Sequence, residues 1–194
     1  MNRLISMILV SLLALQGSAQ RSKDRVIVDN GNKFQYTDSA GTTASYLSLF
    51  GDSIAVPNMM TQDGRTIYPN ATQGKTVVYN FWFTSCKPCV AEMPVLNRLA
   101  AAYRSDSVAF IGVTFDDKEK IEKFLASHSF DFTIALLPLD AIQKLKRVAL
   151  FPLTMILDRH RRVTFVIFGR QVGENDDEAF YDILNWQLRK ALLH

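Results

Sequence analysis

Two cysteines, Cys86 and Cys89, are separated by two residues and are the only ones among the 194 residues of the chain. Thiols at this spacing can close a reversible disulfide with little movement of the backbone. A disulfide that closes so short a loop removes little entropy from the unfolded chain, so it is a weak structural crosslink. The pair therefore indicates redox chemistry rather than stabilisation of a fold.

The residues around the pair favour a reactive thiol. Residues 79–83 are apolar and aromatic, which predicts a buried strand, and the cysteines follow at a position where a helix can begin. The unpaired N–H groups and the dipole at a helix N-terminus stabilise a thiolate. Lys87 adds a positive charge beside Cys86. Pro88 suits the first helical turn, where a missing N–H does no harm.

The N-terminal segment has the pattern of an export signal. Arg3 precedes an apolar run at residues 4–15, and small residues follow at 17–19. This pattern predicts a signal peptide over residues 1–19. The apolar run is shorter than the ~20 residues that a membrane-spanning helix needs, although an uncleaved membrane anchor stays an alternative.

The rest of the chain divides into an extension and a main domain. Residues 20–54 are polar, with short strands expected at 26–28 and 34–36, so we predict an N-terminal extension that contains a β-hairpin. Residues 55–194 are expected to form one domain in which strands and helices alternate. Strands are expected at 76–83, 108–115, 132–137, 153–157 and 163–168, and helices after the cysteines and at 118–127, 139–147 and 176–193. This order, with its final antiparallel hairpin, predicts an α/β fold with a mixed central sheet and helices on both faces.

Taken together, these features resemble the TlpA-like family of exported thiol–disulfide oxidoreductases, which has the thioredoxin fold. The resemblance extends over approximately residues 55–190. It depends on four separate elements: the aromatic strand, Cys-Lys-Pro-Cys at 86–89, Glu-Met-Pro at 92–94 and Phe-Pro-Leu-Thr at 151–154. One position departs from the family pattern, because the family usually has Trp immediately before the first cysteine and this chain has Ser85.

The resemblance implies a role for each residue of the site. Cys86 would be the exposed attacking thiol and Cys89 the buried resolving thiol. Glu92 would be a partly buried carboxylate that tunes both thiols and takes a proton from Cys89. Pro152 would form a cis peptide bond that leaves the backbone of Phe151 open to a client strand. The expected client-binding surface is completed by Trp82, Lys87 and Pro88.

The function implied by the resemblance is that of an exported, periplasmic protein-disulfide reductase without a metal or other cofactor. Its partners would be disulfide-bearing client proteins, with apocytochrome c as one candidate, and a membrane thiol donor of electrons. A disulfide-forming oxidant is an alternative direction of the same chemistry. The net charge of +3, without a long basic run, gives no reason to expect a nucleic-acid partner. Contact with a membrane is expected only through an uncleaved leader.

Other classes of protein that use cysteines fit the sequence less well. A Cu(I) carrier is an alternative, because two thiolates and a histidine such as His160 can bind that ion. A peroxiredoxin would carry Pro-x-x-x-Thr-x-x-Cys, which is absent here. A c-type haem site is excluded because Val90, and not histidine, follows Cys89.

Overall fold

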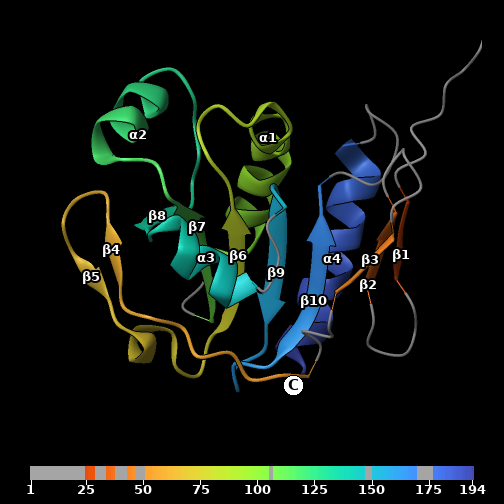
Figure 1. The fold of residues 1–194 in the computed structure, drawn as a ribbon. Coiled ribbons are helices and arrows are strands. Elements are labelled where there is room, and N and C mark those ends of the chain that lie inside the picture. Colours follow the sequence, from red (N-terminus) through yellow and green to blue (C-terminus); the bar gives the residue numbers. More distant parts are fainter. Residues whose placement is uncertain are drawn as a thin grey trace, which may run out of the picture.

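Figure 1 shows the fold of the chain in a computed structural model. The structure describes residues 51–104, 107–146, 150–169 and 177–194, together with the backbone of three strands between residues 25 and 46. The leader predicted at residues 1–19 lies outside the described residues.

A seven-stranded mixed sheet forms the centre of the molecule. Its strands follow the order β10-β9-β6-β7-β8-β4-β5. The three inner strands β6, β7 and β8 are parallel, whereas β9 runs antiparallel to β6, β10 to β9, and β4 to β8. The strands are β4 (Met59–Thr61), β5 (Thr66–Ile67), β6 (Thr76–Phe81), β7 (Val108–Thr114), β8 (Thr133–Leu136), β9 (Leu153–Leu157) and β10 (Val163–Phe168).

The central strand β6 is buried on both faces, because all six of its residues are buried. Its side chains alternate between two hydrophobic clusters, as the period of two along a strand requires. Tyr79 and Phe81 belong to one cluster, and Val78 belongs to the other. A strand with two buried faces has a nearly continuous apolar sequence, which explains why β6 could be predicted from the sequence.

Four helices cover the two faces of the sheet (Figure 1). Helices α1 (Lys87–Ala102) and α4 (Asp177–Leu192) pack against each other, and α4 also contacts β6, β9 and β10. Helix α3 (Leu139–Lys146) lies over the other face, where Ile142 and Leu145 join the cluster of Tyr79 and Phe81. Helix α2 (Lys118–Leu125) places Ile121 in the same cluster as α1 and α4. The predicted mixed sheet with helices on both faces is confirmed.

The N-terminal strands form a separate antiparallel sheet. The two predicted strands are present as β1 (Arg25–Val28) and β2 (Phe34–Thr37), which pair with each other. A third strand, β3 (Thr43–Tyr46), pairs with β2. The sequence did not predict β3, because Thr-Ala-Ser-Tyr carries no apolar run that would distinguish it from a loop.

The segment just before the expected domain boundary packs on the main sheet. The backbone N–H of Gly51 donates to the carbonyl of Val163 at 2.9 Å, and the N–H of Val163 donates to the carbonyl of Asp52 at 3.1 Å. Ile54 is buried in the core. The packed structure thus includes residues 51–54, immediately before residue 55.

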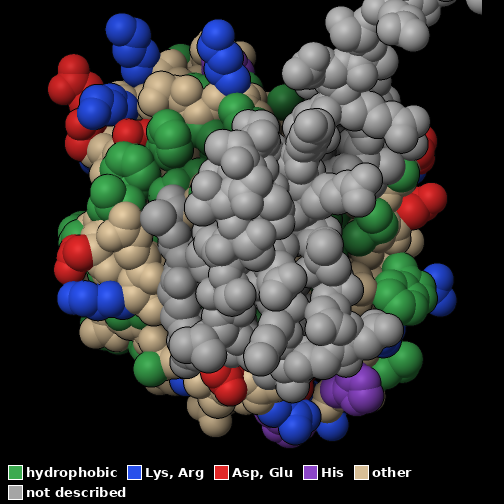
Figure 2. All heavy atoms as spheres, turned by 45° about the vertical axis from the view of Figure 1, so that its right-hand side comes forward, with side chains coloured by type: hydrophobic (Ala, Val, Ile, Leu, Met, Phe, Trp, Pro, Cys, Tyr) green, Lys and Arg blue, Asp and Glu red, His purple; other side chains and the backbone are tan. Residues whose placement is uncertain are grey.

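Charged side chains of both signs are interspersed on the face seen in Figure 2. Where the side chains are described, blue Lys and Arg groups and red Asp and Glu groups both occur around the rim of this face. Among the described residues, no helix is long and apolar enough to cross a bilayer.

Candidate active site

The two cysteines lie where the central strand passes into helix α1. After β6 ends, the N–H of Trp82 still donates to the carbonyl of Val113 at 3.1 Å. The chain then turns, with the N–H of Cys86 donating to the carbonyl of Phe83 at 3.1 Å. Cys86 is the N-cap of α1, and its own carbonyl accepts the first helical bond from the N–H of Val90 at 3.1 Å.

Cys86 and Cys89 are joined in a disulfide with a Cα–Cα distance of 5.2 Å. The Cys86 sulfur also accepts a hydrogen bond from the backbone N–H of Cys89 at 3.2 Å. This N–H is one of those that a helix N-terminus leaves without a helical partner, so the helix itself offers a donor to the sulfur. The same donor would stabilise a Cys86 thiolate in the reduced protein.

The two sulfurs differ less in burial than the family resemblance suggested. Cys86 is 5% exposed and Cys89 is 1% exposed. Cys86 is thus the more accessible of the two, but only a small part of it reaches solvent while the disulfide is closed. Its neighbours Ser85, Lys87 and Pro88 are exposed, so the surface around it is open.

Just before β9, the Phe151–Pro152 peptide bond is cis, as the resemblance implied. Pro152 is buried, and its carbonyl accepts a hydrogen bond from the N–H of Gly169 at 3.1 Å. Phe151 is partly buried and packs against the hydrophobic cluster that contains both cysteines. The fold therefore brings Phe151 to the same hydrophobic cluster as the disulfide, although Phe151 lies 62 positions after Cys89 in the sequence.

Three phenylalanines form an aromatic cluster at this end of the sheet. Phe83 packs edge-on against Phe151, with ring centroids 5.3 Å apart, and tilted against Phe115 at the same distance. Phe115 and Phe151 are 5.7 Å apart. All three rings are half-buried, so part of the cluster faces solvent. Phe115 was not predicted as a site residue, since the only signal in the sequence is an aromatic residue at the end of a strand.

Trp82 lies in the core instead of at the surface. It is 0% exposed, and its ring packs against Phe124 and Phe130 with centroid distances of 5.4 Å. In this structure the Trp82 ring offers no surface to a client. Phe83, the next residue, is instead half-buried and packs in the aromatic cluster.

Glu92 is a buried carboxyl group in the early turns of α1. It is 1% exposed, and a Cβ atom added to Gly169 would lie 3.9 Å from its Oε1 atom. Glu92 follows Cys89 by three residues, so the two side chains lie on neighbouring positions of the helix surface. A carboxyl group this deeply buried is costly to ionise unless its surroundings compensate, which makes it a suitable partner for proton exchange.

Asp116 positions the loop before Cys86 and was also missed as a site residue. Its neighbour Asp117 is the N-cap of α2. Asp117 performs that role, since its carboxylate accepts from the N–H of Lys120 at 2.9 Å. Asp116 is instead 8% exposed and accepts a hydrogen bond from the N–H of Thr84 at 2.6 Å.

His160 lies far from the two cysteines. It is exposed in the turn that follows Leu157 of β9, whereas β9 begins beside Phe81 at the cysteine end. Five residues of strand, at about 3.3 Å each, therefore separate His160 from the disulfide by roughly 15 Å or more. His160 cannot share a metal ion with the cysteines in this conformation. Within the described part of the chain, no three His, Cys, Asp or Glu side chains cluster as a metal site would require.

Comparison with known proteins places the chain in a family. The Redoxin family model matches residues 21–184. The thiol-disulfide oxidoreductase ResA of Geobacillus thermodenitrificans is 30% identical over 139 residues, which cover 67% of this chain and 80% of the relative. The thioredoxin-like protein YneN of Bacillus subtilis is 35% identical over 105 residues, which cover 52% and 61%.

A solved structure agrees with this assignment. The thiol:disulfide interchange protein DsbE of Chlorobium tepidum aligns with a TM-score of 0.62 at 25% identity, over 72% of this chain and 97% of the other. The family match spans most of the chain, and the disulfide lies at the N-terminus of α1. The chain therefore belongs to the redoxin family, with the TlpA-like thioredoxin fold, and is a thiol–disulfide oxidoreductase.

Proposed function

We propose that this enzyme works outside the cytoplasm as a protein-disulfide reductase, with Cys86 as the attacking thiol and Cys89 as the resolving thiol. The observation that carries the proposal is the position of the disulfide. Cys86 caps α1 and is the more accessible sulfur, while Cys89 lies one turn inside the helix at 1% exposure. This arrangement gives the two thiols different roles.

The reaction begins from the reduced pair. The Cys86 thiolate attacks one sulfur of a client disulfide, and the other client sulfur leaves as a thiolate and takes up a proton. A mixed disulfide then joins Cys86 to the client. Cys89 loses its proton, and its thiolate attacks the Cys86 sulfur, which releases the second client thiol. The client disulfide gains two electrons and two protons, and the enzyme is left with the Cys86–Cys89 disulfide seen in the structure.

Glu92 is proposed to exchange the proton of Cys89. Its burial and its position three residues beyond Cys89 support this assignment. Lys87 is exposed beside Cys86 and favours the thiolate of that residue. Lys87 also makes the disulfide easier to reduce, because it stabilises the Cys86 thiolate of the reduced form. The direction of the reaction therefore depends on the balance between Lys87 and Glu92.

The client-binding surface is proposed to surround Cys86. It would include the exposed Pro88, the Phe151–Pro152 segment and Phe83, whose ring packs against Phe151. Part of the Phe83, Phe115 and Phe151 cluster faces solvent and would accept an apolar side chain next to the client cysteine. Unfolded or partly folded proteins with a disulfide, apocytochrome c among them, expose such segments.

Export is proposed from the leader pattern at residues 1–19, with residues 20–54 as an N-terminal extension and residues 55–194 as the catalytic domain. In an oxidising compartment, a reductase needs a continuous supply of electrons. A membrane protein whose thiols are kept reduced from the cytoplasmic side would supply these electrons. Its thiols would reduce the Cys86–Cys89 disulfide by the reverse of the reaction above.

The experiment that tests this proposal measures the reduction potential of the Cys86–Cys89 pair and traps its intermediate. A potential near or below about −270 mV supports a reductase, whereas one near −120 mV would reassign the enzyme as a disulfide-forming oxidant. Cys89→Ser should accumulate a mixed disulfide with a client peptide, and Cys86→Ser should form none. Mixed disulfides on Cys89 in the Cys86→Ser protein would reverse the proposed roles. Tight binding of one Cu(I) ion that His160→Ala weakens would instead favour a copper carrier.

A further inference from the structure

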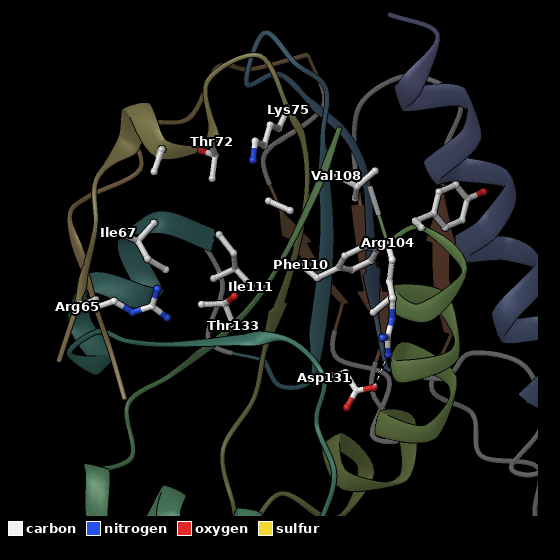
Figure 3. Close-up of a pocket in the computed structure, with 14 residues that line it drawn as sticks. Arg65, Ile67, Thr72, Lys75, Arg104, Val108, Phe110, Ile111, Asp131 and Thr133 are labelled. Carbon is white, nitrogen blue, oxygen red and sulfur yellow. Dashed lines mark ion pairs between the residues drawn. The ribbon is translucent and has the colours of Figure 1, made fainter. Parts of the chain in front are cut away.

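A hollow of about 580 Å³ opens at the end of the sheet opposite to the disulfide (Figure 3). Its walls come from the start of β7, the end of α1, strand β5 and the short helix η1 (Pro69–Thr72). Helix α1 has its N-cap at Cys86 and ends at Ala102, next to the hollow. Its 16 residues span about 24 Å, so the hollow is a site separate from the cysteines.

One wall of the hollow is an edge of strand β7. Strand β6 pairs with β7 along its length, from Val108 onward, but β8 pairs with the other edge only from Ile111 onward. No strand in the described part of the chain pairs with residues 108–110 on that side. Val108 and Phe110 line the hollow there (Figure 3).

The direction of the hydrogen bonds in β7 shows which backbone groups face this edge. The carbonyls of Ser107 and Val113 accept bonds from the β6 side, and the carbonyl of Thr114 accepts one from Leu137 on the β8 side. Because this direction alternates along a strand, the N–H groups of Val108 and Phe110 point toward the hollow. They are positioned to bind the backbone of an added strand.

Basic side chains surround the same hollow. Arg65, Lys75 and Arg104 line it from three different segments, against one acidic lining residue, Asp131 (Figure 3). Arg104 lies 4.0 Å from Asp131, and Arg65 pairs with Asp63 at 2.8 Å. Within the described residues, Lys75 forms no ion pair. The site therefore has a net positive charge and an available ammonium group.

We propose that the hollow is a docking site for an acidic segment of a partner protein, bound in an extended conformation along the edge of β7. Adding a strand to an open edge uses backbone hydrogen bonds for affinity and side-chain contacts for specificity. Alternate side chains of the segment would contact the apolar lining, which includes Ile67 and Phe110, or reach Lys75 and Arg65 with carboxylates. A small free anion would use the basic groups but would leave the strand edge without a partner.

Such a site would hold a partner while the surface around Cys86 stays open. Binding at one end of the molecule raises the effective concentration of the partner's disulfide at the other end, without new contacts at the cysteines. The docking proposal does not depend on the redox direction, because no electron transfer is involved in the binding.

The test uses the full chain and a fluorescein-labelled peptide of alternating Glu and Val residues, followed by fluorescence anisotropy. Lys75→Glu should weaken binding about tenfold or more, because it replaces an attractive charge with a repulsive one. The matched control is Lys123→Glu, which makes the same charge change at an exposed position in the last turn of α2 and should leave binding unchanged. Both variants should keep the wild-type rate of disulfide exchange with a small substrate, since neither residue lies at the cysteines.

Two further measurements separate a docked strand from other forms of binding. Hydrogen exchange at the amides of Val108 and Phe110 should slow when the peptide is added, and a peptide methylated at alternate backbone nitrogens should bind much more weakly. Equal binding of a Lys-Val peptide would overturn the proposal. So would unchanged exchange at both amides, or full competition by millimolar phosphate, which would identify the hollow as an anion site. None of these outcomes depends on whether the enzyme is a reductase.

Discussion

The backbone N–H of Thr84 donates to the Asp116 carboxylate across 2.6 Å, and this bond joins two neighbouring loops at the cysteine end of the sheet. Thr84 stands two residues before Cys86, and Asp116 stands two residues after the end of β7. The N–H of Asp116 in turn donates to the Thr114 hydroxyl at 3.2 Å. The loop that presents Cys86 is therefore fixed by a buried acceptor in the loop that follows the adjacent strand β7.

Replacing Asp116 should affect both stability and catalysis. In Asp116→Ala the Thr84 N–H loses its charged acceptor, and we expect the free energy of unfolding to fall by about 1–3 kcal/mol. Turnover with a disulfide client should fall as well, because the loop before Cys86 becomes less fixed. Urea unfolding and insulin reduction measure the two effects.

Asp117→Ala is the matched control. It removes the cap of α2 and an exposed ion pair with Lys120, at a cost of about 1 kcal/mol, and should leave turnover unchanged. Equal turnover for both variants would contradict a positioning role for Asp116.

Glu92→Gln should slow the step in which Cys89 resolves the mixed disulfide. If Glu92 takes the Cys89 proton, the amide removes this general base, and the rate should fall roughly 10²-fold, at the lower end of such effects. The first attack by Cys86 should change much less. Stopped-flow kinetics with a fluorescent client disulfide resolve the two steps. Glu119→Gln, at an exposed position in the first turn of α2, serves as the control. A loss confined to the first step would show that Glu92 acts on Cys86 and not on Cys89.

Trp82 and Phe83 are adjacent in the sequence but should respond in opposite ways. Trp82 is 0% exposed and fills the core between Phe124 and Phe130, so Trp82→Ala should cost about 3–5 kcal/mol of stability. Phe83 is half-buried in the aromatic cluster, so Phe83→Ala should mainly raise KM for an apolar client peptide. Thermal unfolding and steady-state kinetics on both variants provide the comparison. An unchanged KM for Phe83→Ala, with both apolar and polar clients, would remove the cluster from the client-binding surface.

A methyl group at position 112 should not fit. A Cβ atom built on Gly112 would lie 2.7 Å from Cε1 of Phe130 and 3.1 Å from Nε1 of Trp82. Phe130 is itself held by Trp82 and Phe132, so it cannot move aside easily. We expect Gly112→Ala to lower the free energy of unfolding by about 1–3 kcal/mol, as overpacking does. The same Gly112→Ala substitution should cost less stability in a protein that already carries Phe130→Leu than in the wild type. A double-mutant cycle in urea can measure this difference. Full additivity would mean that the two positions do not clash.

Asp158 should make the stability depend on pH in the acidic range. Burial raises the pKa of Asp158, but hydrogen bonds from Arg162 and from the N–H of His160 outweigh it and hold the pKa below its ordinary value. A carboxylate with a lowered pKa stabilises the fold above the unfolded value of about 3.9, and this contribution is lost as the pH falls through the folded value. Asp158→Asn should therefore cost about 1–2 kcal/mol at pH 7 and progressively less below about pH 4. The control is Asp140→Asn, because the Asp140 carboxylate is exposed. If the free energies of unfolding of the wild type and Asp158→Asn differ by the same amount from pH 7 to pH 3, the ionised form of Asp158 is not the cause.

Much of the fold could be predicted from the sequence, because local patterns encode it. Strand β6 reads as a continuous apolar run since both of its faces are buried. The β9–β10 hairpin and α2 also begin and end close to the expected residues, at turn and cap signals. Strand β3 was missed because its four residues have no such pattern.

The sequence by itself determined the chemistry: two cysteines at the start of a helix, a glutamate one turn further and a Phe-Pro pair before the last hairpin. Only the tertiary structure decided what surrounds them. Phe83, Phe115 and Phe151 gather because the loops after β6 and β7 and before β9 meet at one end of the sheet. Local periodicity carries no information on such contacts. The same holds for the burial of Trp82, for the distance of His160 and for the open edge of β7, which depends on how far β8 extends along its neighbour.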